Sequence, residues 1–485
     1  MSTRSATSSP QSSWPATPGG SSGYEYTPEA TASEPEDETP PLHAVNVALR
    51  WNESKTTIWK VTATFWCAFV MGSNDAAYGA IIPYLEVYYQ KSYTVVSLVF
   101  LSPFVGYTMS AILSNLVHQT FGRRGITIIA PICHIIAFAV ISIHPPFPVL
   151  VIMYVLVGLG SGFHNAAWNV WIGNMANSHE VLGFFHGFYG VGATISPLVA
   201  TTLIIKAGWE WYSYYYLMTG AAVIALIYST SAFWAETGSQ YQQENPTLQG
   251  RGGAFSQTRL ALTYKVTWIS AVFLFLYGGI EVAIGGWIVV FMTTVRNGDP
   301  FESGMAETGF WLGITVGRFV LGFVSPRIGE KLSIAIYLLL AIALELIFWL
   351  VPEFIVSAVA VSFVGFFMGT IFPGVVIVAT RILPKNLHVA AIGFAAAFSM
   401  GGGAVFPFMI GAIAQAKGVT VLQPILLAML AVALGLWAMM FGLPQQEVSH
   451  QVDEVDMCRA GQTVALISAL WNIPPLRTPP NPNTP

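Results

Sequence analysis

The chain has few charged residues and few cysteines. Asp, Glu, Lys and Arg make up 9% of its 485 residues, whereas hydrophobic residues make up 54%. A soluble domain carries about 25% charged residues, so this composition excludes an ordinary soluble protein and indicates one that crosses the lipid bilayer many times. The three cysteines, Cys67, Cys133 and Cys458, have neither metal-ligand nor CxxC spacing, which argues against a metal site and a disulfide framework.

Other absences narrow the function. The formal net charge of −4 argues against a nucleic-acid partner. The sequence has no P-loop, HExxH motif or nucleophile elbow, so it supports neither ATP-driven transport nor an enzyme, and it predicts no cofactor. Residues 1–50 are rich in Ser, Thr, Pro and Glu and contain no apolar core. We therefore expect a disordered tail and no cleaved secretory signal.

Apolar stretches of ~20 residues can cross a bilayer as helices, and this chain has twelve. They lie at approximately 59–84, 93–118, 125–144, 148–172, 182–206, 211–234, 265–292, 305–326, 332–351, 354–380, 388–414 and 421–443. A polar stretch from Glu236 to Thr263 separates six spans from six. The predicted fold is an all-α integral membrane protein with two pseudo-symmetric six-helix halves. The halves occupy 58–235 and 264–443, with a central loop at 236–263 and tails at 1–57 and 444–485.

The positions of the basic residues predict how the chain is oriented. Fifteen Lys and Arg residues fall on the side of the termini, four fall on the opposite side, and Arg318 lies inside a span. Cytoplasmic loops carry the excess of Lys and Arg, so both termini and the central loop are expected in the cytosol. We expect a monomer in the plasma membrane rather than in a vacuolar or other internal membrane.

Two acids occupy matching places in the two halves. Asp75 lies in Gly72-Ser73-Asn74-Asp75-Ala76-Ala77-Tyr78-Gly79, and Glu281 lies in Gly278-Gly279-Ile280-Glu281-Val282-Ala283-Ile284-Gly285, 206 residues later. Glycines repeat as well: Gly106, Gly158 and Gly162 match Gly313, Gly365 and Gly369 at an offset of 207. Such a parallel duplication is typical of transporters whose solute path runs between the halves near the midplane.

The loop Phe121-Gly122-Arg123-Arg124-Gly125, between the second and third spans, carries a resemblance to a known family. Together with the six-plus-six layout, it resembles the major facilitator superfamily over roughly residues 58–443. The resemblance implies a transporter that works by alternating access, and it implies a gating role for Arg123 and Arg124.

Within that superfamily, Asn74-Asp75 resembles the fucose–galactose–glucose proton-symporter branch, in which these residues bind sugar and carry the proton. His186 takes the place of a sugar-contacting Gln of that branch, and His164 lies nearest to the place of its fourth-span acid. Asn74-Asp75 together with Tyr277-Gly278-Gly279-Ile280-Glu281 resembles fungal and animal sugar-transporter-like members of the branch more closely.

Ionisable groups inside a membrane are costly and normally mark function, so we assign Asp75 and Glu281 to proton coupling. The structural alternative for each is a hydrogen bond to backbone or to a neighbouring helix. Arg318 must also have a partner, either an acid or backbone carbonyls, and it is a candidate for gating. Glu345, which has aliphatic neighbours, is interpreted as a structural or lipid-edge acid.

The fourth predicted span carries a run of polar and aromatic side chains: His164, Asn165, Trp168, Asn169 and Trp171. Residues 164, 168 and 171 share one helix face, and the two asparagines flank it. Aromatic rings can stack on the C–H face of a sugar while amide and imidazole groups bond its hydroxyls. The alternative is helix packing, in which Asn also serves as an interhelical bond.

The leading hypothesis is secondary active, proton-coupled symport of a monosaccharide or similar polyol. Its substrate site would use Asn74, His164, Asn165, Asn169, His186 and Trp168. Two alternatives remain open. One is a proton-coupled antiporter that exports amphipathic or drug-like compounds, and the other is a non-transporting sensor or scaffold. The polar residues of the expected cavity favour a small hydroxylated solute.

Overall fold

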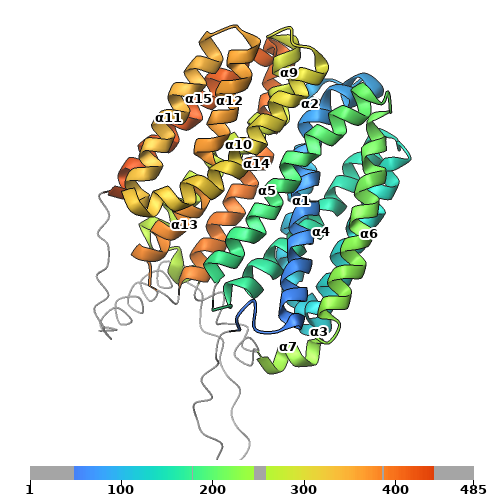
Figure 1. The fold of residues 1–485 in the computed structure, drawn as a ribbon, viewed down its shortest axis with the longest axis vertical. Helices are drawn as coiled ribbons and strands as arrows, with labels where there is room; N and C mark the ends of the chain where they lie inside the picture. Colours follow the sequence, from blue (N-terminus) through green and yellow to red (C-terminus); the bar gives the residue numbers. More distant parts are fainter. Residues whose placement is uncertain (1–48, 177, 245–257, 385–386, 442–485) are drawn as a thin grey trace, which may run out of the picture. The chain divides into compact units, whose positions relative to one another are not determined.

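The computed structural model describes residues 49–176, 178–244, 258–384 and 387–441, and these residues are predominantly helical (Figure 1). The first half contains α1 (Lys55–Tyr89), α2 (Tyr93–Val96), α3 (Leu98–Ser142), α4 (Phe147–Gly173), α5 (Ser178–Thr201) and α6 (Tyr214–Phe233). A π-helical turn (Thr202–Lys206) and a 3-10 turn (Trp211–Ser213) join α5 to α6. The short helix α7 (Gly238–Glu244) follows, inside the predicted central loop.

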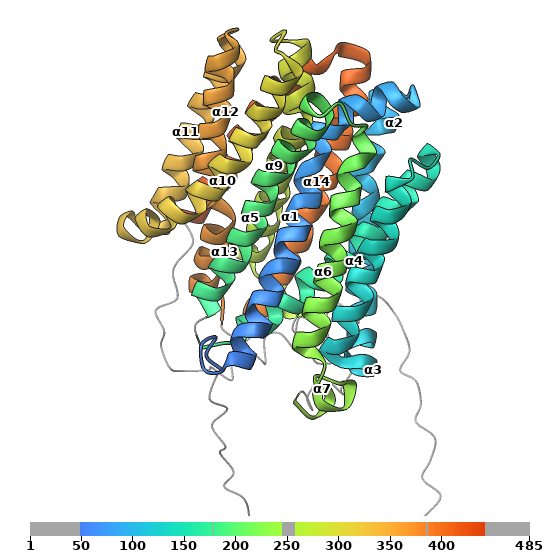
Figure 2. The same cartoon turned by 45° about the vertical axis from the view of Figure 1, so that its right-hand side comes forward.

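The second half contains α9 (Lys265–Thr294), α10 (Pro300–Ile328), α11 (Glu330–Leu350), α12 (Phe354–Met368), α13 (Ile371–Ile382), α14 (His388–Lys417) and α15 (Leu422–Phe441). A 3-10 turn (Val419–Val421) precedes α15. The two ends of the bundle are named here after the short helices found there. The start of α1 and α7 lie at the α7 end, and α2 lies at the α2 end (Figures 1 and 2).

Ten helices among the described residues are long and apolar enough to cross a membrane. One of them, Tyr93–Ser142, contains two predicted spans, because Gly122 interrupts α3 with non-helical backbone at φ 71°. The first predicted span is in α1, which is not among the ten and carries Ser73, Asn74 and Asp75 near its middle. Counting α1 and both parts of α3 gives the twelve predicted crossings, and the twelve-helix all-α fold is confirmed.

The repeated glycines lie where two helices of the same half pack closely. A Cβ on Gly106 of α3 would overlap the Val155 carbonyl of α4, and a Cβ on Gly313 of α10 would overlap the Ser362 carbonyl of α12. The two contacts are equivalent in the repeat: the glycines are 207 residues apart (313 − 106), and so are the carbonyl residues (362 − 155). The glycine repeat therefore reflects a repeated helix contact that admits no side chain.

A second repeated contact holds the helices that carry the two acids. Gly72 of α1 lies against the Tyr189 carbonyl of α5, and Gly278 of α9 lies against the Ser399 carbonyl of α14. The offsets are 206 for the glycines and 210 for the carbonyl residues. Asp75 and Glu281 each follow their glycine by three residues. The duplication therefore presents the two acids on equivalent helices.

The two halves contact each other at the α2 end through reciprocal pairs. Ser97, between α2 and α3, packs against Gly411 of α14, while Thr201 of α5 packs against Gly304 of α10. The offsets, 304 − 97 = 207 and 411 − 201 = 210, relate one pair to the other. We call this contact region the α2-end seam. Its residues are Gly79, Ser97, Phe100, Thr201, Gly285, Gly286, Gly304, Glu307 and Gly411.

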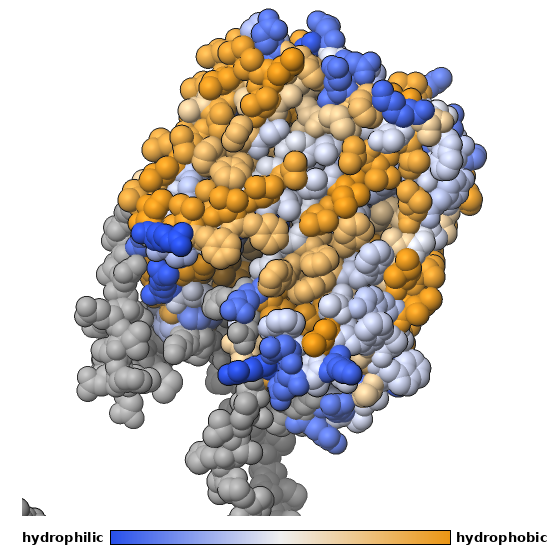
Figure 3. Space-filling view, in the orientation of Figure 1, coloured by the Kyte–Doolittle hydropathy of each residue, from blue (hydrophilic) through white to orange (hydrophobic). Residues whose placement is uncertain are grey.

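The surface is apolar over much of the face between the two ends of the bundle, and hydrophilic residues gather toward those ends (Figure 3). Exposed large side chains include Ile112, Leu116, Ile227, Leu350 and Ile355. An apolar band between polar ends is what a hydrocarbon core requires of the protein that crosses it.

Candidate functional site

Asp75 is held at the middle of α1 by two hydrogen bonds. Tyr189 of α5 donates its hydroxyl to Oδ2 at 2.9 Å, and Asn74 donates Nδ2 to Oδ1 at 3.0 Å. The Asn74 amide also lies 2.9 Å from the Tyr78 hydroxyl. Asp75 itself is partly exposed. The acid is therefore bonded to side chains rather than to backbone freed by the flanking glycines, and it has access to solvent.

The α1 backbone beside Asp75 is fixed by a buried polar cluster. The Ser73 carbonyl accepts the Ser196 hydroxyl at 2.6 Å and the Tyr214 hydroxyl at 2.9 Å. All three residues are at most 4% exposed. Buried polar groups that satisfy one another hold a single arrangement. This cluster ties α1 to α5 and α6, so Asp75 lies on a rigid part of the first half.

Glu281 of α9 pairs with Arg318 of α10. Nη2 of Arg318 lies 3.2 Å from Oε1 of Glu281, and the two side chains are 17% and 14% exposed. Arg318 also donates from Nη1 to the His186 carbonyl of α5 at 3.4 Å. The guanidinium therefore connects an acid of the second half to backbone of the first half. The Asp75 and Glu281 carboxylates are close enough to interact electrostatically.

The helix beside Arg318 is broken. The tenth predicted span divides into α12 and α13 between Met368 and Ile371. Arg318 donates Nε to the Gly369 carbonyl at 3.3 Å, and Tyr277 donates its hydroxyl to the Met368 carbonyl at 3.3 Å. Carbonyls freed by a break in a membrane helix need polar partners. Both sequence alternatives for Arg318 are thus realised, since it pairs with an acid and also bonds carbonyls.

This central site contains two carboxylates and one guanidinium. With both acids ionised, the three side chains carry one net negative charge, because no ion pair of Asp75 occurs among the described residues. A proton or another monovalent cation removes that charge. Tyr189 and Asn74 add groups that can bond hydroxyls or amides. The site therefore has the chemistry to bind a polar solute together with one positive charge.

The predicted residues of the fourth span divide into two groups. His164 and Trp168 are 1% and 0% exposed and lie inside the first half, where the Trp168 ring is 4.8 Å from the Phe233 ring of α6. The His164 ring lies 5.7 Å from that of His134. These contacts belong to packing between α3, α4 and α6. Both side chains are therefore buried within the first half and are not exposed to a solute beside Asp75.

Asn165 and Asn169 are partly exposed and bond to each other. Nδ2 of Asn169 lies 2.7 Å from Oδ1 of Asn165 and 2.8 Å from its carbonyl oxygen. Their amides therefore keep unused acceptors and donors for a solute. His186 is also partly exposed. Its carbonyl contacts Arg318, which places His186 at the central site.

Arg123 and Arg124 lie at the α7 end of the first half. Nη1 of Arg123 lies 2.8 Å from Glu236, which also pairs with Lys60 of α1. The Arg124 guanidinium lies 5.1 Å from the centre of the Trp234 ring. Glu236 itself is 7% exposed. These contacts join α1, α6 and the loop at Gly122 to Glu236, the first residue of the central loop.

Sequence reasoning missed three residues that the structure makes prominent. Glu236 follows the sixth apolar span, and its nearness to a loop with two arginines was the available signal. Tyr189 lies three residues after His186, but a tyrosine in an aromatic segment gives little warning. Glu307 lies near the start of α10, where an acid is easily taken for a surface residue, yet it is 0% exposed.

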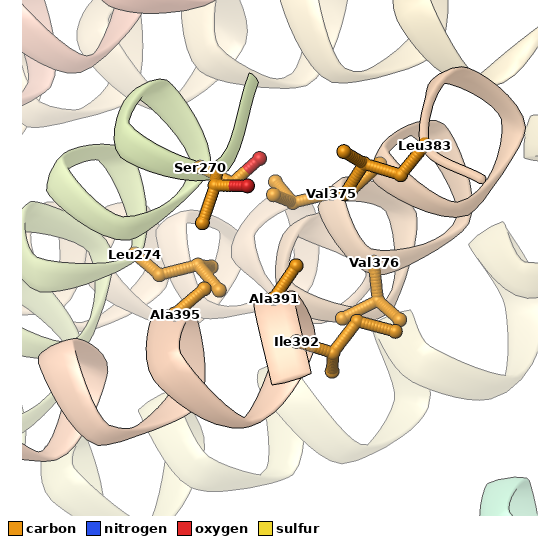
Figure 4. A pocket seen from close by; sticks show the side chains of 10 residues that line it. Ser270, Leu274, Val375, Val376, Leu383, Ala391, Ile392 and Ala395 are labelled. Atoms are coloured by element: carbon orange, nitrogen blue, oxygen red, sulfur yellow. The ribbon is translucent and has the colours of Figure 1, made fainter. Parts of the chain in front are cut away.

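A small hollow in the second half differs in character from the central site. It is lined by Ser270 and Leu274 of α9, Val375 and Val376 of α13, and Ala391, Ile392 and Ala395 of α14 (Figure 4). Its lining is almost entirely apolar and contains none of the predicted site residues. It offers little for binding a hydroxylated solute.

Comparison with known proteins gives a family. The family model of the Major Facilitator Superfamily matches residues 64–407, and again residues 275–478. Bypass of stop codon protein 6 of Saccharomyces cerevisiae is 31% identical over 382 residues, which cover 72% of this chain and 76% of that protein. A glucose/mannose transporter of Bacillus subtilis is 24% identical over 350 residues, covering 71% of this chain and 85% of that one.

Solved structures share the fold. A D-xylose-proton symporter matches with a TM-score of 0.64 at 13% identity, covering 80% of this chain and 98% of that one. The fucose:proton symporter of Escherichia coli matches with a TM-score of 0.57 at 14% identity, covering 78% of this chain and 98% of that one. At such low identity the likeness concerns the arrangement of helices alone.

Proposed function

The chain belongs to the major facilitator superfamily, and on this premise we propose that it is a proton-coupled symporter of a monosaccharide or similar polyol. Membership makes it a membrane transport protein rather than an enzyme. The observation that carries the proposal is the ion pair of Glu281 with Arg318, which leaves Asp75, within electrostatic range of Glu281, bonded among the described residues only to the neutral Tyr189 and Asn74. An uncompensated charge inside a membrane marks an ion or proton path.

Asp75 is the group that exchanges the proton. Glu281 has a cation within reach, whereas the Asp75 carboxylate accepts bonds from the neutral groups Tyr189 and Asn74. A neutral partner can stay bonded whether the carboxyl is charged or protonated. Glu281 and Arg318 act in solute recognition and in linking the halves, since Arg318 reaches the His186 carbonyl.

The sugar class is supported by the polar groups around the acids and by the printed names of relatives. Asn165, Asn169, Tyr189 and His186 are partly exposed and together present amide, hydroxyl and imidazole groups, whereas Asn74 is 2% exposed and supports Asp75 from behind. A glucose/mannose transporter and a glucose/galactose transporter are among the relatives. An export pump for drug-like compounds would favour an apolar pocket, so the hydroxylated solute fits better.

The transport cycle is alternating access between the two halves. Seam contacts such as Ser97 with Gly411 close the α2 end. The acids are partly exposed. We therefore propose that this state is closed at the α2 end and gives access to the acids from the α7 end. The predicted orientation makes that end cytosolic, with both termini. The monomeric state and the plasma membrane stay predictions.

The test is uptake by the full chain in proteoliposomes with an imposed pH gradient, acidic outside. Labelled glucose, galactose and mannose are offered separately. We expect at least one to accumulate, and an uncoupler should abolish its accumulation. The control variant is Glu345→Gln, which neutralises a buried acid of α11 outside the central site and should accumulate sugar as the parent protein does.

Each alternative has its own result. Export of an amphipathic dye driven by the gradient, without sugar uptake, would support the antiporter. Tight sugar binding with neither uptake nor exchange would support the sensor. Accumulation that persists fully after the gradient is collapsed would contradict proton coupling.

A further inference from the structure

Glu307 is a second kind of acid in this protein, and the proposed site does not use it. It lies in the second turn of α10 and is 0% exposed. Neither carboxylate oxygen has a hydrogen-bond partner among the described residues. Its carboxylate lies against Gly79 of α1, in the other half of the protein. An acid that is buried, unpaired and placed on the contact between two moving halves requires an explanation.

The repeat relates this position to a packing contact of the other half. Phe100 of α3 packs against Gly286 of α9, and Glu307 of α10 packs against Gly79 of α1. These contacts are reciprocal, because 307 − 100 and 286 − 79 are both 207. Each half thus inserts one large side chain opposite a glycine of the other half. In one half that side chain is a phenylalanine, which suits a dry contact, and in the other it is an acid.

Among the described residues, none forms an ion pair with Glu307. On its own helix, the indole of Trp311 lies one turn later without a hydrogen bond of normal geometry. Tyr214 of α6 interacts with it electrostatically but is neutral. Asp75 of α1 and Glu281 of α9 lie one turn away along their helices and have partners of their own.

Other charged groups near the start of α10 are also engaged elsewhere. Lys206 lies 4.3 Å from the centre of the Phe301 ring, and Asp299 accepts the Phe301 backbone N–H at 2.8 Å. Glu302 is an exposed acid and would not stabilise another negative charge. Burial of an ionised carboxylate without a partner is costly, so the closed seam favours the protonated form of Glu307.

We propose that Glu307 is a proton-controlled latch of the α2-end seam. When the seam is closed, the neutral acid fits against Gly79 as Phe100 fits against Gly286. When the halves separate at this end, water reaches the carboxyl and it releases its proton. The ionised form then opposes closure until a proton returns. The inference rests on the alternating-access part of the proposed function, and it is independent of the solute.

The sign of the pH effect follows from this linkage. The closed state binds the proton and the open state releases it, so a fall in pH favours closure and a rise in pH favours opening. A proton taken up on the α2 side therefore drives the protein toward the state that is open at the α7 end. One linked proton changes the ratio of open to closed by up to about tenfold per pH unit.

A cysteine placed in the seam measures this ratio. Ser97 is 0% exposed and packs against Gly411, away from Glu307, so Ser97→Cys reacts with a maleimide only when the seam opens. The full chain, purified in nanodiscs with Cys458→Ser, is labelled from pH 5 to pH 8. Rates are divided by those of Ser239→Cys, which is exposed on α7 and corrects for the reactivity of the thiol itself.

We expect the corrected rate to rise with pH in the parent protein. Glu307→Gln keeps the neutral shape of the acid and should lower both the steepness of the rise and the rate at high pH. Glu307→Leu is a second neutral variant and should do the same. The matched control is Glu345→Gln, because Glu345 is also 0% exposed and has no hydrogen-bond partner among the described residues, but it lies in α11. It should leave the rise unchanged.

Three results would overturn the latch: no rise in the parent protein, an unchanged slope in both Glu307 variants, or an equal loss of slope in Glu345→Gln. Failure of the sugar proposal is a separate outcome. If no sugar is transported and the slope still depends on Glu307, the latch stands and the solute assignment is wrong. If sugar accumulates but the pH dependence of the labelling rate is the same in the Glu307 variants as in the parent protein, only the latch is wrong.

Discussion

The guanidinium of Arg318 lies 3.2 Å from the carboxylate of Glu281 and 3.4 Å from the carbonyl oxygen of His186. Glu281 belongs to the second half of the protein, and His186 belongs to the first. One side chain thus joins an intramembrane acid to the backbone across the path between the halves. The pair lies on the α7 side of the seam, where its contacts must change if the halves rock.

Arg318→Gln should therefore weaken both stability and recognition. It leaves Glu281 unpaired and removes bonds to two carbonyls. The loss of a charged hydrogen bond costs about 1.5–3 kcal/mol, so the thermal midpoint of the purified protein should fall. Glu281→Gln alone should cost less, because the carbonyl bonds of Arg318 remain.

The double variant Arg318→Gln with Glu281→Gln shows how much of each stability loss comes from the interaction between the two residues. If the two residues act as a pair, their effects should not add, and the double variant should be more stable than the sum of the two losses predicts. Thermal unfolding of all four proteins in the same detergent measures this. Strict additivity would contradict the pairing.

The fourth helix gives a prediction about affinity. Asn165→Ala removes the partner of Asn169 and one acceptor for a solute hydroxyl. A hydrogen bond to a neutral hydroxyl contributes about 0.5–1.5 kcal/mol, so the half-saturation concentration should rise roughly 2- to 13-fold. Asn169→Ala should act similarly. Sugar titration of uptake measures the shift, and unchanged affinity in both variants would assign these residues to packing.

Trp168 should respond differently, although it shares the same helix. It is 0% exposed and packs on Phe233. Truncating a buried tryptophan to alanine typically costs about 3–5 kcal/mol, so Trp168→Ala should lower the amount of folded protein. Whatever folds should keep its affinity for sugar. A large loss of affinity in stable protein would return Trp168 to the sugar site.

The fold could be predicted from the sequence because the bilayer imposes simple rules. Each crossing needs a long apolar run, and the glycine repeat predicts which positions of the two halves correspond. Gly106 with Val155 and Gly313 with Ser362 supply the physical reason for that repeat. The break at Gly122 also came at the predicted boundary between two spans. Boundaries such as Met368–Ile371 were missed, since a short interruption leaves hydropathy almost unchanged.

The site was only partly predictable for a related reason. Asp75, Glu281 and Arg318 are visible in the sequence as charges in apolar runs, and the structure pairs Glu281 with Arg318 and leaves Asp75 within electrostatic range of Glu281. Which face of a helix points to the path depends on packing, so the sequence could not separate Asn165 from its buried neighbour Trp168. Tyr189 and Glu307 depend on contacts between distant segments. No local pattern marks them.

Glu236 gives a prediction about the α7 end. It is 7% exposed and pairs with both Arg123 and Lys60. Glu236→Gln would leave two cations facing a neutral amide, and the expected loss of stability is about 1–3 kcal/mol. The measurement is the thermal midpoint, with the exposed Glu353→Gln as the control. Equal midpoints for the two variants would show that the pairing contributes nothing to stability.

The decisive prediction concerns the two acids. Asp75→Asn imitates the protonated acid permanently and can still accept the Tyr189 hydroxyl. Such a protein should bind sugar and exchange it for sugar across the membrane. It cannot return empty by releasing the proton, so accumulation driven by the pH gradient should be lost. Glu281→Gln should bind sugar more weakly and should still accumulate it in response to pH.

Both variants are to be compared in proteoliposomes, with counterflow and gradient-driven uptake measured on the same preparation. The duplication places an acid at the same position in each half, so the coupling group could have been either one. If Asp75→Asn concentrates sugar and Glu281→Gln does not, the roles of the two acids are reversed. Protonation of Glu281 would then weaken its ion pair with Arg318. If both variants concentrate sugar as the parent protein does, the proton does not pass through this pair. Arg318 neutralises only one of the two carboxylates, so another cation must then neutralise the second. Uptake measured with a sodium gradient in place of the pH gradient would test whether that cation is sodium.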